Sequence, residues 1–192
     1  MLKMNTKQYF TESAQTKLDF IEQNEQNLNE VINIIIDCLK RWNKLLIAWN
    51  GWSAADAQHW AAELIGRYKL ERKSLPAIAL TTDTSILTAI WNDYWYDEIF
   101  VKQVEWLGNT WDIFIWISTS WNSKNIIKAL ELAKEKWLTT IWLTWKWGWE
   151  MKDLCDYNLI VPSNNTPRIQ ECHMTIYHTI CEELENTMFK NN

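Results

Sequence analysis

The fold of this chain is decided by the stretch from Leu45 to Arg67, LLIAWNGWSAADAQHWAAELIGR. An apolar run of strand length ends in a small polar turn, and helical spacing follows with Ser53 placed as N-cap. The stretch therefore predicts a strand, a turn and a helix. Unpaired N–H groups at such a helix N-terminus favour a phosphate. Because His59 and Glu63 are four residues apart, they share one face of the helix.

Further apolar runs have the length of buried strands, and helical patterns separate them. The predicted strands are Lys44–Ala48, Ala77–Thr82, Asp112–Ser118, Thr139–Thr144 and Asn158–Val161. Strands that alternate with helices form a parallel sheet covered on both faces. We therefore predict a doubly wound, flavodoxin-like α/β fold with a five-stranded parallel sheet.

The predicted helices follow from apolar residues at helical spacing. Residues 1–15 are polar and weakly patterned, so we expect a frayed lead-in before a long helix that starts at Leu18. Asp83 is expected to cap a helix that ends near Ile90, before a turn at Trp91–Trp95. Further helices are predicted over Ser53–Tyr68, Tyr96–Leu107, Ile126–Leu132, Glu150–Cys155 and Thr166–Leu184.

A length of 192 residues fits one domain with a substantial core. We expect a single domain over residues 1–192, with a helical arm over 1–40 and an α/β core and C-terminal helix over 41–192. The net charge of −5 argues against nucleic acid as a partner. No apolar stretch approaches the ~20 residues of a membrane span, and the N-terminus lacks a signal-peptide core, so we expect a cytoplasmic protein. The cysteines are too scattered for a zinc finger and predict reduced, mostly buried thiols: Cys38, Cys155, Cys172 and Cys181.

Two polar turns, Asn50–Ser53 and Ser118–Ser123, follow predicted strands. In parallel sheets, ligands bind beyond the carboxyl ends of the strands, so we expect these turns to meet in one pocket. Their hydroxyl and backbone N–H groups suit a phosphate. The same residues would also serve as ordinary helix caps.

Six motifs occur in a specific order: NGxSAADAQH at 50–59, AAELxGRY at 61–68, ALTTDTS at 79–85, NDY at 92–94, ISTSxNS at 117–123 and TPRIQE at 166–171. Together they resemble the phosphoheptose isomerase family of the SIS (sugar isomerase) superfamily. The likeness extends from Leu39 to Glu185. The resemblance implies conversion of sedoheptulose 7-phosphate to D-glycero-D-manno-heptose 7-phosphate, which leads to nucleotide-activated heptose.

Ketose–aldose isomerisation needs a base at carbon and an acid or base at the oxygens. The resemblance implies that Glu63 and His178 fill these roles. Without it, Glu63 would be a solvated helix residue and His178 a core or interface histidine. The substrate contacts that the resemblance implies are Asn50, Gly51, Trp52, Ser53, Glu63, Asn92, Asp93, Ser118, Thr119, Ser120, Ser123 and Gln170.

The resemblance also implies zinc on His59, Glu63, Gln170 and His178, whose nitrogen and oxygen donors suit Zn²⁺. The spacing His-x-x-x-Glu alone is a weak signal, and such a zinc could be structural, because hydrogen bonds alone can polarise a carbonyl. The family further implies a homotetramer with sites between subunits, which would give the N-terminal helix a partner.

We expect Arg67 and Arg168 to form salt bridges that brace the site, Asp56 to complement its helix dipole, and His173 to be structural.

A competing function is a non-catalytic SIS module that senses a sugar phosphate or binds a protein such as a replication initiator. A pure binder has no need for both Glu63 and His178, so this pair favours the enzyme.

Tryptophan is in excess: the chain has 15 Trp and only 4 Gly, whereas average usage would give about 13 glycines. The family typically has glycine at thirteen of the Trp positions, all except Trp60 and Trp106. A left-handed turn costs a residue with a Cβ ~1–2 kcal/mol. If half of these sites need that geometry, the sum rivals the ~5–15 kcal/mol that stabilises a domain. We therefore hypothesise that the source reads UGA as glycine and that the translated sequence writes tryptophan at residues 42, 49, 52, 91, 95, 111, 116, 121, 137, 142, 145, 147 and 149.

If these tryptophans are literal, the indoles obstruct both phosphate turns, and a third reading follows, an inactive chain.

Overall fold

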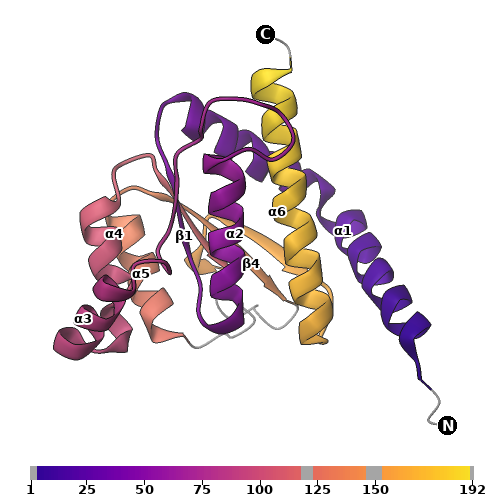
Figure 1. Cartoon of the computed structure of the whole chain (residues 1–192), viewed down its shortest axis with the longest axis horizontal. Coiled ribbons are helices and arrows are strands. Elements are labelled where there is room, and N and C mark those ends of the chain that lie inside the picture. Colours follow the sequence, from indigo (N-terminus) through magenta and orange to yellow (C-terminus); the bar gives the residue numbers. More distant parts are fainter. Residues whose placement is uncertain (1–3, 118–122, 146–152, 191–192) are drawn as a thin grey trace.

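A computed structural model describes residues 4–117, 123–145 and 153–190. Five parallel strands form one sheet in the order β2-β1-β3-β4-β5. Helices lie on both sides of the sheet (Figure 1). The predicted doubly wound α/β fold is confirmed, although the second strand ends three residues earlier than expected. The strands are β1 (Leu45–Ala48), β2 (Ala77–Ala79), β3 (Ile113–Ile117), β4 (Thr139–Trp145) and β5 (Tyr157–Val161).

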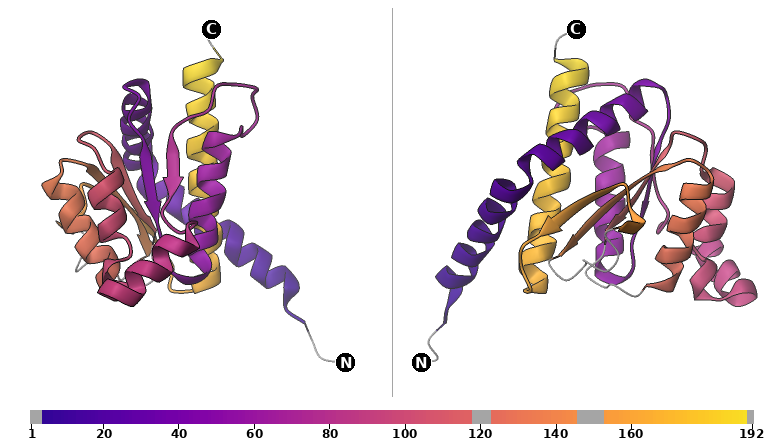
Figure 2. Two further views of the ribbon diagram at one scale, coloured as in Figure 1. Left: turned by 60° about the vertical axis from the view of Figure 1, so that its left-hand side comes forward. Right: turned by 180° about the vertical axis from the view of Figure 1, so that it is seen from behind.

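The helices divide into two layers (Figures 1 and 2). On one side lie α1 (Thr6–Lys40), α2 (Ala54–Ile65) and α6 (Thr166–Phe189), and on the other α3 (Thr84–Tyr94), α4 (Val101–Leu107) and α5 (Lys124–Glu135). Because side chains alternate along a strand, Leu45 and Ile47 enter the core under α1, α2 and α6, whereas Leu46 and Ala48 enter the opposite core.

The N-terminal helix is longer than the sequence pattern predicted. It begins at Thr6, so the expectation of a frayed segment over residues 1–15 is wrong. Tertiary contacts stabilise this helix although its apolar pattern is weak. Arg168 on α6 donates to the carbonyl of Tyr9 at 2.7 Å, and Asn27 donates to the carbonyl of Asn158 on β5 at 2.6 Å. The first turns of α1 still project beyond the rest of the molecule (Figure 2).

Three other boundaries differ from expectation or lie outside the description. The predicted turn at Trp91–Trp95 is wrong, because α3 continues to Tyr94 and ends only at Trp95. The predicted helix Tyr96–Leu107 is divided into a 3-10 turn (Tyr96–Glu98) and α4. Asp83 caps α3 as predicted and accepts a hydrogen bond from the N–H of Ile86 at 2.9 Å. The helix predicted over Glu150–Cys155 lies largely outside the described residues.

All non-glycine residues with positive φ in the described chain are tryptophans at positions where the resemblance implies glycine: Trp42, Trp95, Trp111 and Trp137, with φ between 62° and 75°. Trp137 follows α5 in a Schellman motif, in which the N–H of Leu138 bonds the carbonyl of Ala133. Trp42 ends α1 in the same way, through the N–H of Asn43 and the carbonyl of Cys38. Glycine is the usual residue at this position of the motif, so the backbone supports the UGA hypothesis.

Two further tryptophans lie deep in the core. Trp116 on β3 and Trp142 on β4 are paired in register, and their rings stack with centroids 4.6 Å apart. Within the described structure neither indole N–H has a hydrogen-bond partner. Burying such a donor without a partner costs about 1–3 kcal/mol. The same holds for Trp60, so this observation does not separate the thirteen positions from the others.

Candidate functional site

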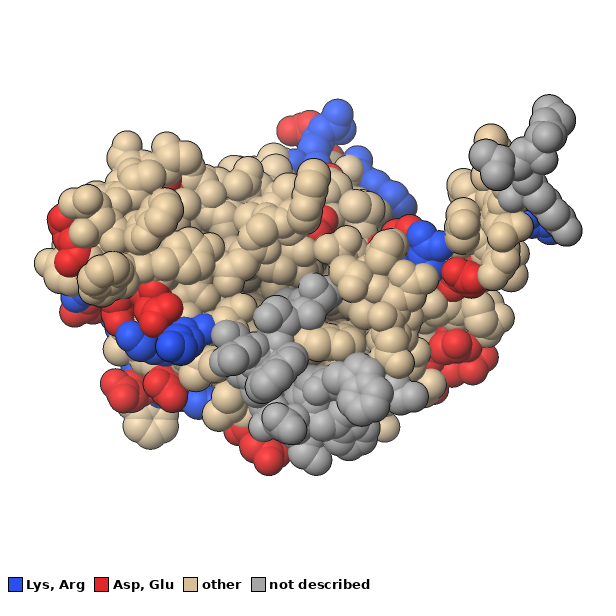
Figure 3. Space-filling model, turned by 90° about the horizontal axis from the view of Figure 1, so that it is seen from below, with Lys and Arg blue, Asp and Glu red and all other residues tan. Residues whose placement is uncertain are grey.

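The site begins where β1 and β3 lie side by side, although they are not consecutive in the chain. Ligands bind beyond the carboxyl ends of parallel strands at such a switch point. The turn after β1 is described, whereas Ser118, Thr119 and Ser120 after β3 lie outside the described residues, so their phosphate contacts stay predictions. Figure 3 views the molecule from this end. On the described part of this surface, charged side chains gather mainly toward the margins.

The turn after β1 has a different local geometry from the one expected. A 3-10 turn over Gly51–Ser53 precedes α2, so Ser53 occupies the N-cap position in a helical conformation and its side chain makes no capping hydrogen bond. The predicted capping bond is therefore wrong. Gly51 has φ 63° and is exposed, and the side chain of Trp52 is 92% exposed.

Asn50 is held by a buried partner that sequence reasoning missed. Its amide and that of Asn125, at the start of α5, exchange two hydrogen bonds of 3.0 and 2.9 Å. The hydroxyl of Tyr96 donates to the Asn50 side-chain oxygen at 2.9 Å. Because α5 follows the turn after β3, the amide pair joins the two edges of the switch point. Ser123 is the N-cap residue of α5 and makes no side-chain capping bond.

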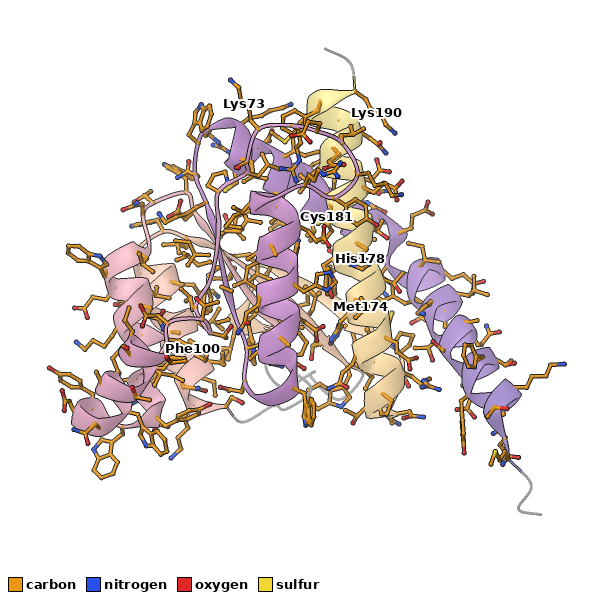
Figure 4. The ribbon with its side chains drawn as sticks, viewed as in Figure 1. Lys73, Phe100, Met174, His178, Cys181 and Lys190 are labelled. Carbon is orange, nitrogen blue, oxygen red and sulfur yellow. The ribbon has the colours of Figure 1, made fainter. Side chains whose placement is uncertain are left out.

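His59, Glu63 and His178 form one cluster. Nε2 of His59 lies 3.0 Å from Oε1 of Glu63 on α2, as their spacing predicted. His178 projects from α6 into the space between α6 and α2 (Figure 4), and its ring centroid lies 5.1 Å from that of His59. One nitrogen or oxygen atom from each residue lies within 4.8 Å of the others.

This cluster has the donor set of a metal site. Nε2 of His178 is buried and has no hydrogen-bond partner among the described residues. Burial lowers the pKa of His178, as does His59, while Glu63 opposes the shift. A neutral imidazole with a free lone pair is a metal ligand, so the three residues could hold a metal ion.

A hollow of about 450 Å³ lies beside the cluster. Trp52, Asp56, Gln170 and His178 are among its lining residues, so two predicted contacts, Trp52 and Gln170, join His178 here. A second hollow of about 150 Å³ lies by Asn50 and Gly51.

Asn92 and Asp93 are not brought to the cluster. They are exposed at the end of α3, where the Asn92 amide donates to the Asp93 carboxylate at 2.8 Å. Neither residue lines the hollow beside His178 or the one by Asn50. Their predicted substrate contact therefore has no support within this single chain.

Tyr177 is a site residue that sequence reasoning missed. Its buried ring stacks on Trp60 at 5.6 Å, and its hydroxyl lies 2.9 Å from Nδ1 of His59 and 3.5 Å from Oδ1 of Asp56. Burial raises the pKa of the Tyr177 phenol, and Asp56 raises it further. Burial also raises the pKa of Asp56, although its bond to Tyr177 opposes the shift. Asp56 therefore does more than complement a helix dipole.

Arg67 and Arg168 form salt bridges as predicted, but the arginine that bonds to the backbone of Glu63 is Arg72. Arg67 contacts Glu71 at 3.9 Å on the exposed surface, and Arg168 pairs with Glu171 at 2.5 Å near α1. Arg72 is buried, donates to the backbone carbonyl of Glu63 at 2.8 Å, and pairs with a glutamate on α6. Only the buried environment, which the sequence does not show, distinguishes it from the other two.

The remaining histidine and the thiols lie in the core, as expected. Nε2 of His173 contacts the carbonyl of Thr144 at 3.2 Å, and burial lowers its pKa to about 4. Burial raises the pKa of every thiol to about 12, so all four cysteines are unreactive: Cys38, Cys155, Cys172 and Cys181.

Comparison with known proteins gives a consistent result. The profile of the SIS domain family matches residues 8–144. The phosphoheptose isomerase of Aliarcobacter butzleri is 52% identical over 179 residues, which cover 93% of this chain and 95% of that protein. That of Aquifex aeolicus is 52% identical over 179 residues, 93% and 94% of the two chains.

Solved structures agree. Phosphoheptose isomerase from Neisseria gonorrhoeae superposes with a TM-score of 0.88 at 39% identity, and covers 95% of this chain and 97% of its own. The enzyme from Francisella tularensis gives 0.90 at 36% identity with the same coverage. Within the described residues, no helix combines the length and apolar character that a membrane crossing requires.

Proposed function

Because this chain belongs to the phosphoheptose isomerase family of SIS-domain proteins, we propose that it converts sedoheptulose 7-phosphate to D-glycero-D-manno-heptose 7-phosphate. The chain is an isomerase. One observation carries the proposed chemistry: a carboxylate and an imidazole from separate helices meet in one cluster, and the imidazole of His178 lines an open hollow.

Glu63 and His178 are the proposed proton-transferring pair. The reaction moves a hydrogen between adjacent carbons through an enediol, so one group must act at carbon and another at the oxygens. Glu63 is the base at carbon. The lowered pKa of His178 keeps its imidazole neutral near pH 7, so in the metal-free site it can both accept and donate a proton at oxygen.

The sugar phosphate is proposed to lie between the two turns of the switch point. Its phosphate binds the turn of Ser118, Thr119, Ser120 and Ser123, and the sugar contacts Asn50–Ser53 and Gln170. The hollow lined by Gln170 and His178 and the amide pair of Asn50 support this orientation. Asn92 and Asp93 would contact substrate only in an assembly that brings them to a site.

Zinc is the proposed metal, held by His59, Glu63 and His178 with Gln170 as a fourth ligand. The buried, unpartnered Nε2 of His178 supports a cation there. When bound, zinc supplies a positive charge that polarises the carbonyl or fixes the ligands in place.

A homotetramer is the proposed assembly. The projecting part of α1 carries exposed apolar side chains, among them Tyr9, Phe10 and Leu18, which are 53%, 81% and 54% exposed. A hollow of about 400 Å³ lies between α1 and α6 beside them. Apolar surface of this kind is typical of an interface.

The proposal is tested with Glu63→Gln, which keeps the size of the side chain but removes the base. We expect turnover of sedoheptulose 7-phosphate to fall about 100- to 10,000-fold while the substrate still binds. Glu71→Gln is the matched control, because Glu71 is 91% exposed at its side chain and contacts only Arg67 among the ion pairs of the described residues. Full turnover by Glu63→Gln would refute the assignment.

A further inference from the structure

Tyr177 contacts His59 through the ring nitrogen that does not face Glu63, and the Tyr177 ring also lies 4.8 Å from the ring of His178. Its ring is buried and stacked on Trp60, so the hydroxyl has little freedom to move. That hydroxyl is 2.9 Å from Nδ1 of His59, while Nε2 of the same ring is 3.0 Å from Glu63. Both ring nitrogens are therefore occupied, and the plane of the imidazole is fixed from both ends.

We propose that Tyr177 is a positioning residue, whose hydroxyl holds Nδ1 of His59 so that Nε2 is presented to the cluster, with Asp56 receiving the hydroxyl hydrogen when a cation binds. This inference rests on the proposed metal site. It concerns Tyr177, which is neither a proposed zinc ligand nor a proposed substrate contact.

The hydroxyl suits both states of the site because it can donate or accept a hydrogen bond. Without a cation, Nε2–H of neutral His59 donates to Glu63, and the phenol donates chiefly to Nδ1 at 2.9 Å, with Asp56 as a longer second acceptor at 3.5 Å. A cation on Nε2 needs a lone pair there, so the ring hydrogen resides on Nδ1 and is donated to the phenol oxygen. The phenol then directs its own hydrogen to Asp56, 3.5 Å away. The imidazole carries one hydrogen in both states, so the protons balance.

Phenylalanine has no hydroxyl, so it can neither donate to Nδ1 of His59 in the cation-free site nor accept from it in the cation-bound site. In Tyr177→Phe the stacked ring is kept, but Nδ1 of His59 loses its partner in a partly buried site. Groups that orient a metal-bound histidine typically contribute about 10- to 100-fold to metal affinity. We expect a loss of this size for Tyr177→Phe and a smaller loss for Asp56→Asn, which keeps an acceptor without the charge.

Two measurements on the full-length chain test the proposal. The first is zinc affinity, by competition with a chromogenic chelator. The second is the ¹⁵N spectrum of the histidine side chains in zinc-free protein, which is simple because the chain has 3 histidines. His59→Gln assigns the His59 signals. Tyr157→Phe is the matched control, since it removes a hydroxyl from β5.

The expected result is weaker zinc binding and a shifted Nδ1 signal of His59 in Tyr177→Phe, with Tyr157→Phe like wild type. An unchanged His59 spectrum, or an equal loss of affinity in Tyr157→Phe, would overturn the proposal. Failure of the wild-type chain to bind zinc would instead overturn the metal site of the proposed function, and the zinc-free spectra would still test the contact with Tyr177.

Discussion

Nε of Arg72 lies 3.0 Å from Oε1 of Glu185, and both side chains are almost completely buried. The backbone N–H groups of residues 68–70 also donate to the Glu185 carboxylate, at 2.8 to 3.0 Å. Arg72 donates in turn to the carbonyl of Glu63. This buried pair therefore ties the end of α2 to α6, the two helices that contribute Glu63 and His178.

Removing the charge of Glu185 should lower the stability of the folded chain. Breaking a buried ion pair leaves an uncompensated charge, so we expect Glu185→Gln to lower the free energy of unfolding by about 3–5 kcal/mol in urea denaturation. Glu182→Gln is the control, because Glu182 pairs with Lys69 on the exposed surface and should contribute at most about 1 kcal/mol. Equal losses in the two variants would contradict this account.

The same carboxylate should make stability depend on pH. Burial alone would raise the pKa of Glu185, but the backbone N–H bonds and Arg72 outweigh it and lower the pKa below the ordinary value of 4.5. The unfolded chain then binds more protons in this range, so the contribution of Glu185 is complete above pH 4.5 and is lost as pH falls through the lowered pKa. Unfolding measured from about pH 7 to about pH 3 should show the difference between wild type and Glu185→Gln shrinking at the acid end. A difference that grows there would have the wrong sign.

The amide pair of Asn50 and Asn125 predicts a binding defect. Asn125→Ala leaves the Asn50 amide with fewer partners and releases the turn after β1 from α5. We expect KM for sedoheptulose 7-phosphate to rise about ten-fold, with a smaller change in kcat. Steady-state kinetics check this, with the exposed Asn29→Ala on α1 as control. An unchanged KM would show that the pair does not support the substrate turn.

The UGA hypothesis predicts that glycine substitution changes the stability of the chain in opposite directions at Trp137 and at Trp106. Trp137 has φ 62° at the end of α5, so Trp137→Gly relieves strain and should stabilise the chain by about 1 kcal/mol. Trp106 is 86% exposed in α4, where Trp106→Gly should destabilise by roughly 0.5 kcal/mol. Thermal unfolding of both variants measures the difference.

The native protein gives the direct test. Its mass, measured after purification from the source, should correspond to thirteen glycines at the thirteen positions. UGG codons there, or a mass that includes every tryptophan, would refute the hypothesis.

The sequence predicted those features that depend on local pattern. Apolar runs indicated all five strands, and the four-residue spacing of His59 and Glu63 gave their contact correctly. It failed where contacts distant in the chain decide the outcome. The first turns of α1 have a weak apolar pattern of their own and pack through Arg168. Nothing local distinguishes buried Arg72 from exposed Arg67, or Tyr177 from the other residues of the α6 stripe.

The roles of Asn92 and Asp93 also could not be predicted from the sequence alone. Their motif was recognised from the family, yet in one chain they are exposed and bond each other. If the proposed assembly completes their contact with substrate, that contact cannot be identified from one chain.

His59, Glu63 and His178 all come from one polypeptide. Uptake of a cation by this cluster should therefore be insensitive to dilution of the protein. Turnover should decline when dilution separates the subunits, if neighbouring chains complete the pocket for the sugar. Measuring cation binding and turnover over a range of protein concentrations would thus separate cation binding from catalysis without any mutation.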